Sequence, residues 1–121
     1  MVIRKIARQD TSGQPSRAQL DVAIAPFVKA MGLARPRYSQ RGSLISMSTD
    51  RGPSIPSDSF MHLAAGLGWS YTGSNKGPYF HEYLFCKERL SLLLEKGNES
   101  QPYTVVAVRW TSDLDSPAYC K

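Results

Sequence analysis

Four residues of this chain carry side chains suited to nucleophilic, general-base or metal-binding chemistry: His62, His81, Cys86 and Cys120. A thiol beside an imidazole can form a nucleophile–base pair, and the four together are a possible ligand set for zinc. Cys86 follows His81 by five residues. That spacing puts the two side chains on opposite faces of a strand and roughly 140° apart on a helix. The sequence therefore predicts no local catalytic pair. The spacings of the four residues also match no compact zinc pattern, so we expect no metal site and no cofactor.

The two cysteines bear on the compartment in which the chain works. Cys86 and Cys120 are far apart, and neither lies in a CxxC motif. The N-terminus, "MVIRKIARQD", has basic residues but no apolar segment typical of a secretory signal. We therefore expect a cytoplasmic protein. Cysteines in cytoplasmic proteins are usually reduced, so both are expected to be free thiols.

Positive charge is concentrated in the first part of the chain. The net charge is +5, and residues 1–51 carry nine basic and three acidic side chains, whereas the remainder carries six and seven. The segment "ARPRYSQRG" places Arg35, Arg37 and Arg41 around Tyr38. Arginines bind phosphates and a tyrosine can stack on an unpaired base, so these residues form a candidate nucleic-acid site. The alternative is a solvated loop whose charges keep the protein soluble.

A second group of residues is rich in aromatic side chains and lies in the second half of the chain. Some of these rings must lie on the outer face of a sheet if the strands alternate inward and outward residues. Exposed aromatic residues beside an arginine are typical of protein interfaces, and they also suit a ligand cleft between a sheet and helices. The candidate interaction residues are Trp69, Tyr71, Tyr79, His81, Tyr83, Arg109 and Trp110.

Two helices are expected to position these residues. Ser16 and Gln19 form a capping-box pattern, and apolar residues follow at helical spacing up to Met31. Pro26 lies inside this pattern, which predicts a kink or two short helices. A second helix is expected to begin at Ser57 or Asp58 and to end at the glycines near position 67.

Strands are expected in the remainder of the chain. "SLISM", "WSYT", "YFHEYLF" and "YTVVAVRW" have the composition or the alternation of strands. The segment "CKERLSLLLEKG", residues 86–97, favours a helix by local propensity, with a strand as the alternative. Together these elements predict an α+β fold in which one or two N-terminal helices pack on a C-terminal antiparallel sheet.

The expected organisation is an arm over residues 1–15, either flexible or an edge strand, followed by a single α+β domain over residues 16–121. No motif is specific enough to indicate a family. We expect a non-enzymatic, cytoplasmic accessory module that binds another protein or itself as a homodimer, with no membrane contact. The alternatives are a nucleic-acid-binding module that uses the basic first half, and a small-molecule binder or unrecognised enzyme with His62, His81 or Cys86 in a cleft.

Overall fold

The computed structural model describes residues 8–31, 37–38, 44–49, 56–98, 100 and 102–121. Its two helices and six strands follow one another along the chain as α1 (Arg17–Met31), β1 (Arg37–Tyr38), β2 (Leu44–Thr49), α2 (Ser57–Gly66), β3 (Ser70–Lys76), β4 (Phe80–Lys87), β5 (Leu90–Gly97) and β6 (Thr104–Arg109). No helix among the described residues is both long enough and apolar enough to cross a membrane.

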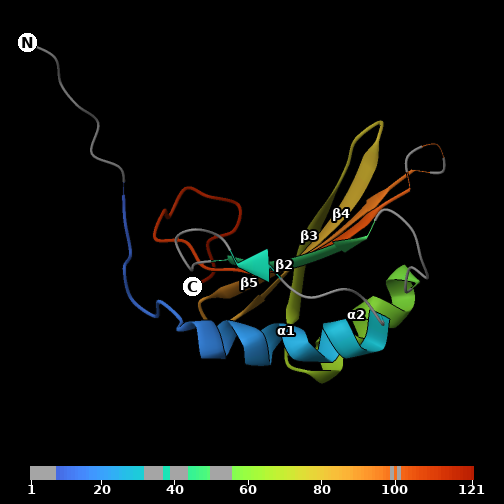
Figure 1. Ribbon diagram of the computed structural model, residues 1–121. Helices are drawn as coiled ribbons and strands as arrows, with labels where there is room; N and C mark the ends of the chain where they lie inside the picture. The colour runs from blue at the N-terminus through green and yellow to red at the C-terminus, as the bar shows by residue number, and fades with distance from the viewer. Residues whose placement is uncertain (1–7, 32–36, 39–43, 50–55, 99, 101) are drawn as a thin grey trace, which may run out of the picture.

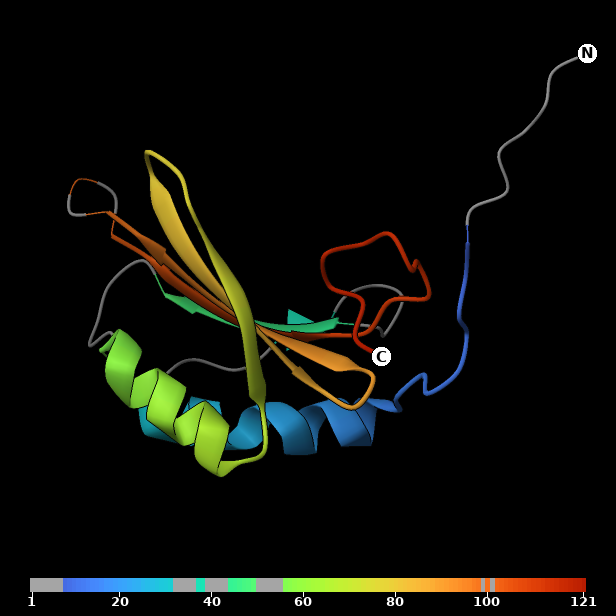
Figure 2. The ribbon, with the colours of Figure 1, turned by 180° about the vertical axis from the view of Figure 1, so that it is seen from behind.

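The strands form one twisted antiparallel sheet in the order β1-β2-β6-β5-β4-β3. Both helices lie against the same face of this sheet, and the segment after β6 lies on the other face (Figures 1 and 2). We call these the helix face and the distal face. The expected α+β fold, with helices packed on an antiparallel sheet, is therefore confirmed.

The first helix begins with the expected capping box. The Ser16 side chain accepts a hydrogen bond from the Gln19 backbone N–H (3.2 Å), and the Gln19 side chain accepts one from the Ser16 backbone N–H (2.8 Å). The expectation of two short helices is wrong, because α1 continues through Pro26. Proline removes the hydrogen bond to the carbonyl of Val22. Val22 is 74% exposed, so the missing hydrogen bond lies on the solvent side of the helix.

Aromatic rings connect the two helices to the sheet. Phe27 of α1 stacks on Phe60 of α2 with ring centroids 4.9 Å apart, and Phe60 lies 5.8 Å from Phe85 of β4. All three side chains are buried, together with Leu92 of β5 and Val108 of β6. The core is thus a layer between the helices and the helix face, as the apolar spacing of both helices predicts.

The segment from 87 to 96 is not the helix that local propensity favours, because Leu90–Gly97 is strand β5. It pairs with β4 on one side and β6 on the other. The alternation then puts Leu92 and Leu94, both fully buried, on the helix face. Two ladders of backbone hydrogen bonds and this buried row outweigh a propensity difference of a few tenths of a kcal/mol per residue.

Cys86 and Cys120 form a disulfide, with Cα atoms 5.7 Å apart and 34 positions apart in the sequence. The expectation of two free thiols is therefore wrong. The expectation came from the compartment, whereas pairing depends on the distance between the Cα atoms, which only the tertiary fold sets. The bond ties β4 to the segment after β6, residues 110–121, which we call the strap.

The strap also pairs with an early part of the chain, residues 8–12. Gln9 and Asp113 form an isolated antiparallel bridge, and the Asp10 backbone N–H donates to the carbonyl of Ser112 (2.6 Å). The N–H of Leu114 donates to the carbonyl of Arg8 (3.3 Å). Segments from opposite ends of the sequence thus lie side by side at one end of the sheet.

Arg89, in the turn between β4 and β5, joins these two segments. Its guanidinium donates to four backbone carbonyls and lies 4.5 Å from the centre of the Tyr119 ring. The four acceptors are the carbonyls of Asp10 (2.7 Å), Ser12 (3.1 Å), Thr111 (3.1 Å) and Cys120 (3.1 Å). An ion pair with the Asp10 carboxylate (Nε to Oδ2, 3.4 Å) completes the set.

Asp10 should make the stability of this junction depend on pH. Hydrogen bonds from Ser12 and Tyr119, together with the charge of Arg89, lower the pKa of Asp10 from 3.8 to about 2. A lowered folded-state pKa stabilises the protein above the unfolded-state value and ceases to do so as pH falls through the folded value. We expect the melting temperature of the wild-type chain to exceed that of Asp10→Asn near neutral pH. The difference should shrink between about pH 4 and pH 2 in thermal melts of the two proteins, and a constant difference would contradict this origin.

Candidate functional site

The aromatic residues of the candidate surface do not share one environment. Tyr71 on β3 is 48% exposed and Tyr79, between β3 and β4, is 64% exposed, whereas Trp69 is only 5% exposed. His81 and Tyr83 are half-buried on β4 and stack at 4.3 Å, with the Tyr83 hydroxyl 3.2 Å from His81 Nδ1. The two tyrosines that face water are therefore the ones available to a partner.

The other two members of that group lie away from the exposed tyrosines. Arg109 is half-buried at the end of β6, where burial lowers the pKa of its guanidinium while Glu82 and Glu95 oppose that shift. Trp110 starts the strap, and its indole N–H donates to the carbonyl of Ser12 (3.1 Å). These two residues belong to the distal face and to the strap junction.

The structure describes only part of the candidate nucleic-acid site. Arg35 and Arg41 lie outside the described residues. Arg37 and Tyr38 form β1, and their backbones pair with Ser46 and Ile45 of β2. The nucleic-acid hypothesis consequently stays a prediction of the sequence.

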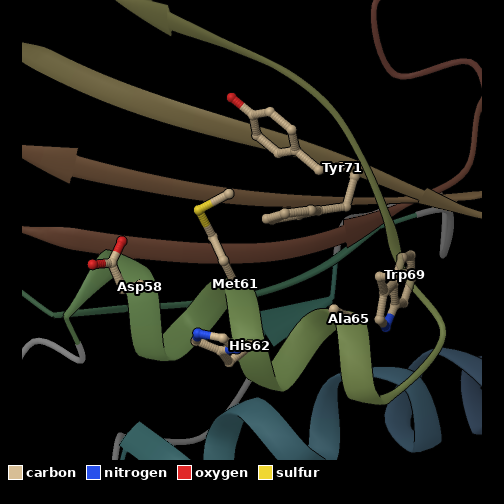
Figure 3. A pocket seen from close by; sticks show the side chains of 7 residues that line it. Asp58, Met61, His62, Ala65, Trp69 and Tyr71 are labelled. Atoms are coloured by element: carbon tan, nitrogen blue, oxygen red, sulfur yellow. The ribbon is translucent and has the colours of Figure 1, made fainter.

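A groove lies between α2 and the β3–β4 part of the sheet (Figure 3). Its volume is about 420 Å³, which falls within the range of ligand and side-chain pockets in proteins. The lining consists of Asp58, Met61, His62 and Ala65 from α2, Trp69 from the connection, Tyr71 from β3 and Phe85 from β4. An opening of this size suits one large side chain or a small apolar molecule.

Helical spacing explains how α2 serves both the core and the groove. Phe60 and Ala64, four residues apart, are fully buried in the core. Positions 58, 61, 62 and 65 are three, four and seven residues apart, so they form a second stripe on the same helix. Sequence reasoning missed this stripe because it begins with a charged residue, and only Met61 within it is an obvious apolar signal.

The end of α2 positions Trp69, which lines one end of the groove. Gly68 follows the helix with φ +92°, a conformation that L side chains rarely adopt, and turns the chain back toward the sheet. The N–H of Trp69 then donates to the carbonyl of Ala64 (3.0 Å). The indole is consequently held by backbone geometry as well as by packing.

The groove has an apolar floor and a polar rim. Met61 points from α2 toward the sheet, near the Tyr71 ring, whereas Asp58 and His62 lie along the helix (Figure 3). The Tyr71 ring also packs against Phe85, with centroids 5.5 Å apart. Methionine adapts readily to different shapes, and an exposed tyrosine offers a ring and a hydroxyl at low entropic cost. This composition favours binding of an apolar side chain over bond-breaking chemistry.

The groove opens beside an edge of the sheet. β3 is the last strand in the sheet order, and within the described part of the chain only β4 pairs with it. A bulge lies between Tyr71 and Gly73, where the Thr72 hydroxyl donates to the carbonyl of Leu84 (3.1 Å). An edge strand leaves a row of backbone donors and acceptors unpaired, which is a template for one more strand.

A second groove lies between α1 and the β4–β5 turn, with a volume of about 440 Å³. Val22, Pro26 and Leu90 contribute to its apolar lining, and Lys87 and Glu88 contribute charges. Trp69 lines this groove as well as the first. The second groove lies beside the β4–β5 turn rather than along the edge strand β3. A segment bound there therefore has no strand edge to pair with.

The residues suited to catalysis are not brought together in a reactive arrangement. Cys86 is held in the disulfide, so it is not a thiol nucleophile in this state. His62 lies on the rim of the first groove, whereas His81 packs against Tyr83. Within the described ranges, no group of three or more His, Cys, Asp and Glu side chains is arranged to hold a metal ion.

Comparisons with protein-family models, with curated proteins and with solved structures found no match to this chain.

Proposed function

We propose that this chain is a non-enzymatic protein-binding module. In this proposal, an extended segment of a partner protein lies along the free edge of β3 and inserts one large apolar side chain into the groove between α2 and β3. The observation that carries the proposal is the position of an apolar groove of about 420 Å³ directly beside the edge strand. The exposed ring of Tyr71 belongs to both features.

Strand addition is a recurring mode of peptide recognition in which the two parts of such a site have separate roles. Backbone hydrogen bonds to the edge strand supply affinity, and side-chain pockets beside the edge supply specificity. Here β3 supplies the edge, while α2 supplies a wall of the pocket through Met61 and Ala65. Asp58 on the rim favours a partner segment that carries a basic residue near its apolar anchor.

Filling the groove should weaken binding. Ala65 is exposed and lines the groove, so Ala65→Phe places a ring where the partner side chain must enter. Burying such an anchor contributes about 1.5–3 kcal/mol, and we therefore expect at least a tenfold loss of affinity. The probe is a linear peptide selected from a random display library on the wild-type protein, with affinity measured by fluorescence anisotropy.

The matched control is Ser59→Phe, which adds the same ring at an exposed α2 position outside the groove. Its affinity for the selected peptide should equal that of the wild type. Equal binding by both variants would place the binding site elsewhere, and failure to select any peptide would count against the module as a whole.

The strand-addition part of the proposal has its own test, made on the peptide. In an added strand, alternate backbone N–H groups point toward the edge strand and the others point to solvent. N-methylation of one alternating set should therefore abolish binding, whereas methylation of the other set should be tolerated. If methylation of both sets is tolerated, the partner side chain still binds in the groove but the peptide does not add as a strand to β3. If light scattering shows a dimer that the peptide dissociates, the natural partner segment is β3 of a second copy.

A further inference from the structure

We infer that the Cys86–Cys120 disulfide acts as a redox-operated latch for the strap. When the disulfide is oxidised, residues 110–121 lie closed on the distal face and hold residues 8–12 beside them. When it is reduced, the strap and residues 8–12 detach, while the sheet and the helices stay folded. This inference is independent of the proposed binding function, since the groove lies on the helix face beside the β3 edge, whereas the strap lies on the distal face.

The strap has few apolar anchors of its own. Its buried residues are Ala118, 7% exposed, and Cys120, 1% exposed. It contains no helix or strand and is built from turns, such as the bond from the Tyr119 N–H to the carbonyl of Ser116 (3.0 Å). Apart from the disulfide, the strap is held mainly by polar contacts, with Arg89 and with residues 8–12, and such a segment opens locally at a lower free energy than the sheet.

The sheet does not depend on the strap in the same way. Leu92, Leu94, Val106 and Val108 are fully buried on the helix face, opposite the strap. The disulfide takes no part in the packing of these residues against the helices. Opening of the strap is therefore expected to be local rather than global.

Polar groups at the junction gain from opening. Ser91 pairs with Cys86 on one side in register and with Arg109 on the other. Its hydroxyl and the Nε atom of Arg109 are buried and have no hydrogen-bond partner among the described residues. A buried polar group without a partner destabilises the closed form, and access to water removes that penalty. In the closed form, the disulfide and the hydrogen bonds of Arg89 offset this penalty.

The reduction that opens the latch consumes two electrons from a dithiol. The Sγ–Sγ bond breaks, each cysteine sulfur takes up one proton, and the dithiol becomes a disulfide. Dithiol reductants keep thiols reduced in the cytoplasm, whereas secretory compartments are oxidising. The strap would thus be open in the cytoplasm that the sequence predicts for this protein, and closed in an oxidising compartment.

Hydrogen exchange read by mass spectrometry tests the latch on the full chain. Samples of the wild type with and without dithiothreitol are compared with Cys120→Ser. We expect amides in 110–121 and 8–12 to exchange at least about tenfold faster in the reduced wild type and in the variant, with 92–96 and 104–108 unchanged. Adding dithiothreitol to Cys120→Ser should change nothing further, which shows that the reductant acts through this bond.

Three results would overturn the inference. In the first, thiol titration shows that both cysteines are reduced, yet the amides of the strap remain as protected as before. The disulfide would then not be the latch. Loss of protection throughout the sheet would mean that the bond holds the whole fold rather than a local segment. A chain purified without reductant should titrate no free thiol, and two free thiols at that stage would contradict the closed form.

Discussion

Arg89→Ala is expected to lower the free energy of unfolding by about 3 kcal/mol. The side chain is 14% exposed. Its guanidinium donates hydrogen bonds to backbone carbonyls in two segments, residues 8–12 and the strap. A hydrogen bond from a charged donor contributes more to stability than one from a neutral donor. Alanine at this position also leaves part-buried carbonyls without a partner. Urea unfolding at neutral pH, followed by circular dichroism, measures the effect.

Two further variants show whether the fork geometry or only the charge matters. Arg89→Lys keeps the charge but cannot reach several carbonyls at once, so most of the loss should remain. Lys87→Ala is the matched control, because Lys87 is two residues earlier and makes one exposed hydrogen bond, to the carbonyl of Leu67 (2.8 Å). It should cost less than about 1 kcal/mol. Equal losses for Arg89→Ala and Lys87→Ala would contradict the role of Arg89.

Phe60→Ala is expected to lower the free energy of unfolding by about 4 kcal/mol. Phe60 is fully buried and is the middle ring between Phe27 of α1 and Phe85 of β4. Removing it leaves a cavity where the two helices meet the sheet, and such substitutions cost about 3–5 kcal/mol. Urea unfolding of the variant beside the wild type provides the measurement.

The size of the replacement should set the size of that loss. Phe60→Leu fills most of the space and is expected to cost less than half as much as Phe60→Ala. Tyr79→Ala removes a ring that is 64% exposed and should have little effect. If Phe60→Ala costs no more than Tyr79→Ala, the stacked rings are not the centre of the core.

The local elements of this fold could be predicted because their signals are local. The Ser16 capping box marks the start of α1, and the four-residue spacing of Phe60 and Ala64 marks the buried side of α2. The alternation from Tyr79 to Phe85 correctly separates His81 from Cys86, which lie on opposite faces of β4. Each of these signals lies within about ten residues of sequence.

The features that could not be predicted depend on distant parts of the chain. β5 is a strand because β4 and β6 flank it, and no property of residues 90–97 alone reveals those neighbours. The disulfide requires the strap to return to β4 after β6. The groove combines the outer stripe of α2 with Tyr71, and the order of the strands decides that these meet.

The two tryptophans lie in different parts of this protein, so their fluorescence reports on two different events. The chain has only Trp69 and Trp110. Trp69 lines both grooves, whereas Trp110 lies at the strap junction with the Arg89 guanidinium 5.5 Å from its ring centre. Trp110→Phe therefore leaves an emission spectrum that responds to occupancy of the grooves. A change in emission that the wild type shows and this variant does not comes from Trp110 and follows the strap. Ligand binding and strap opening can therefore both be followed by intrinsic fluorescence, without an attached dye.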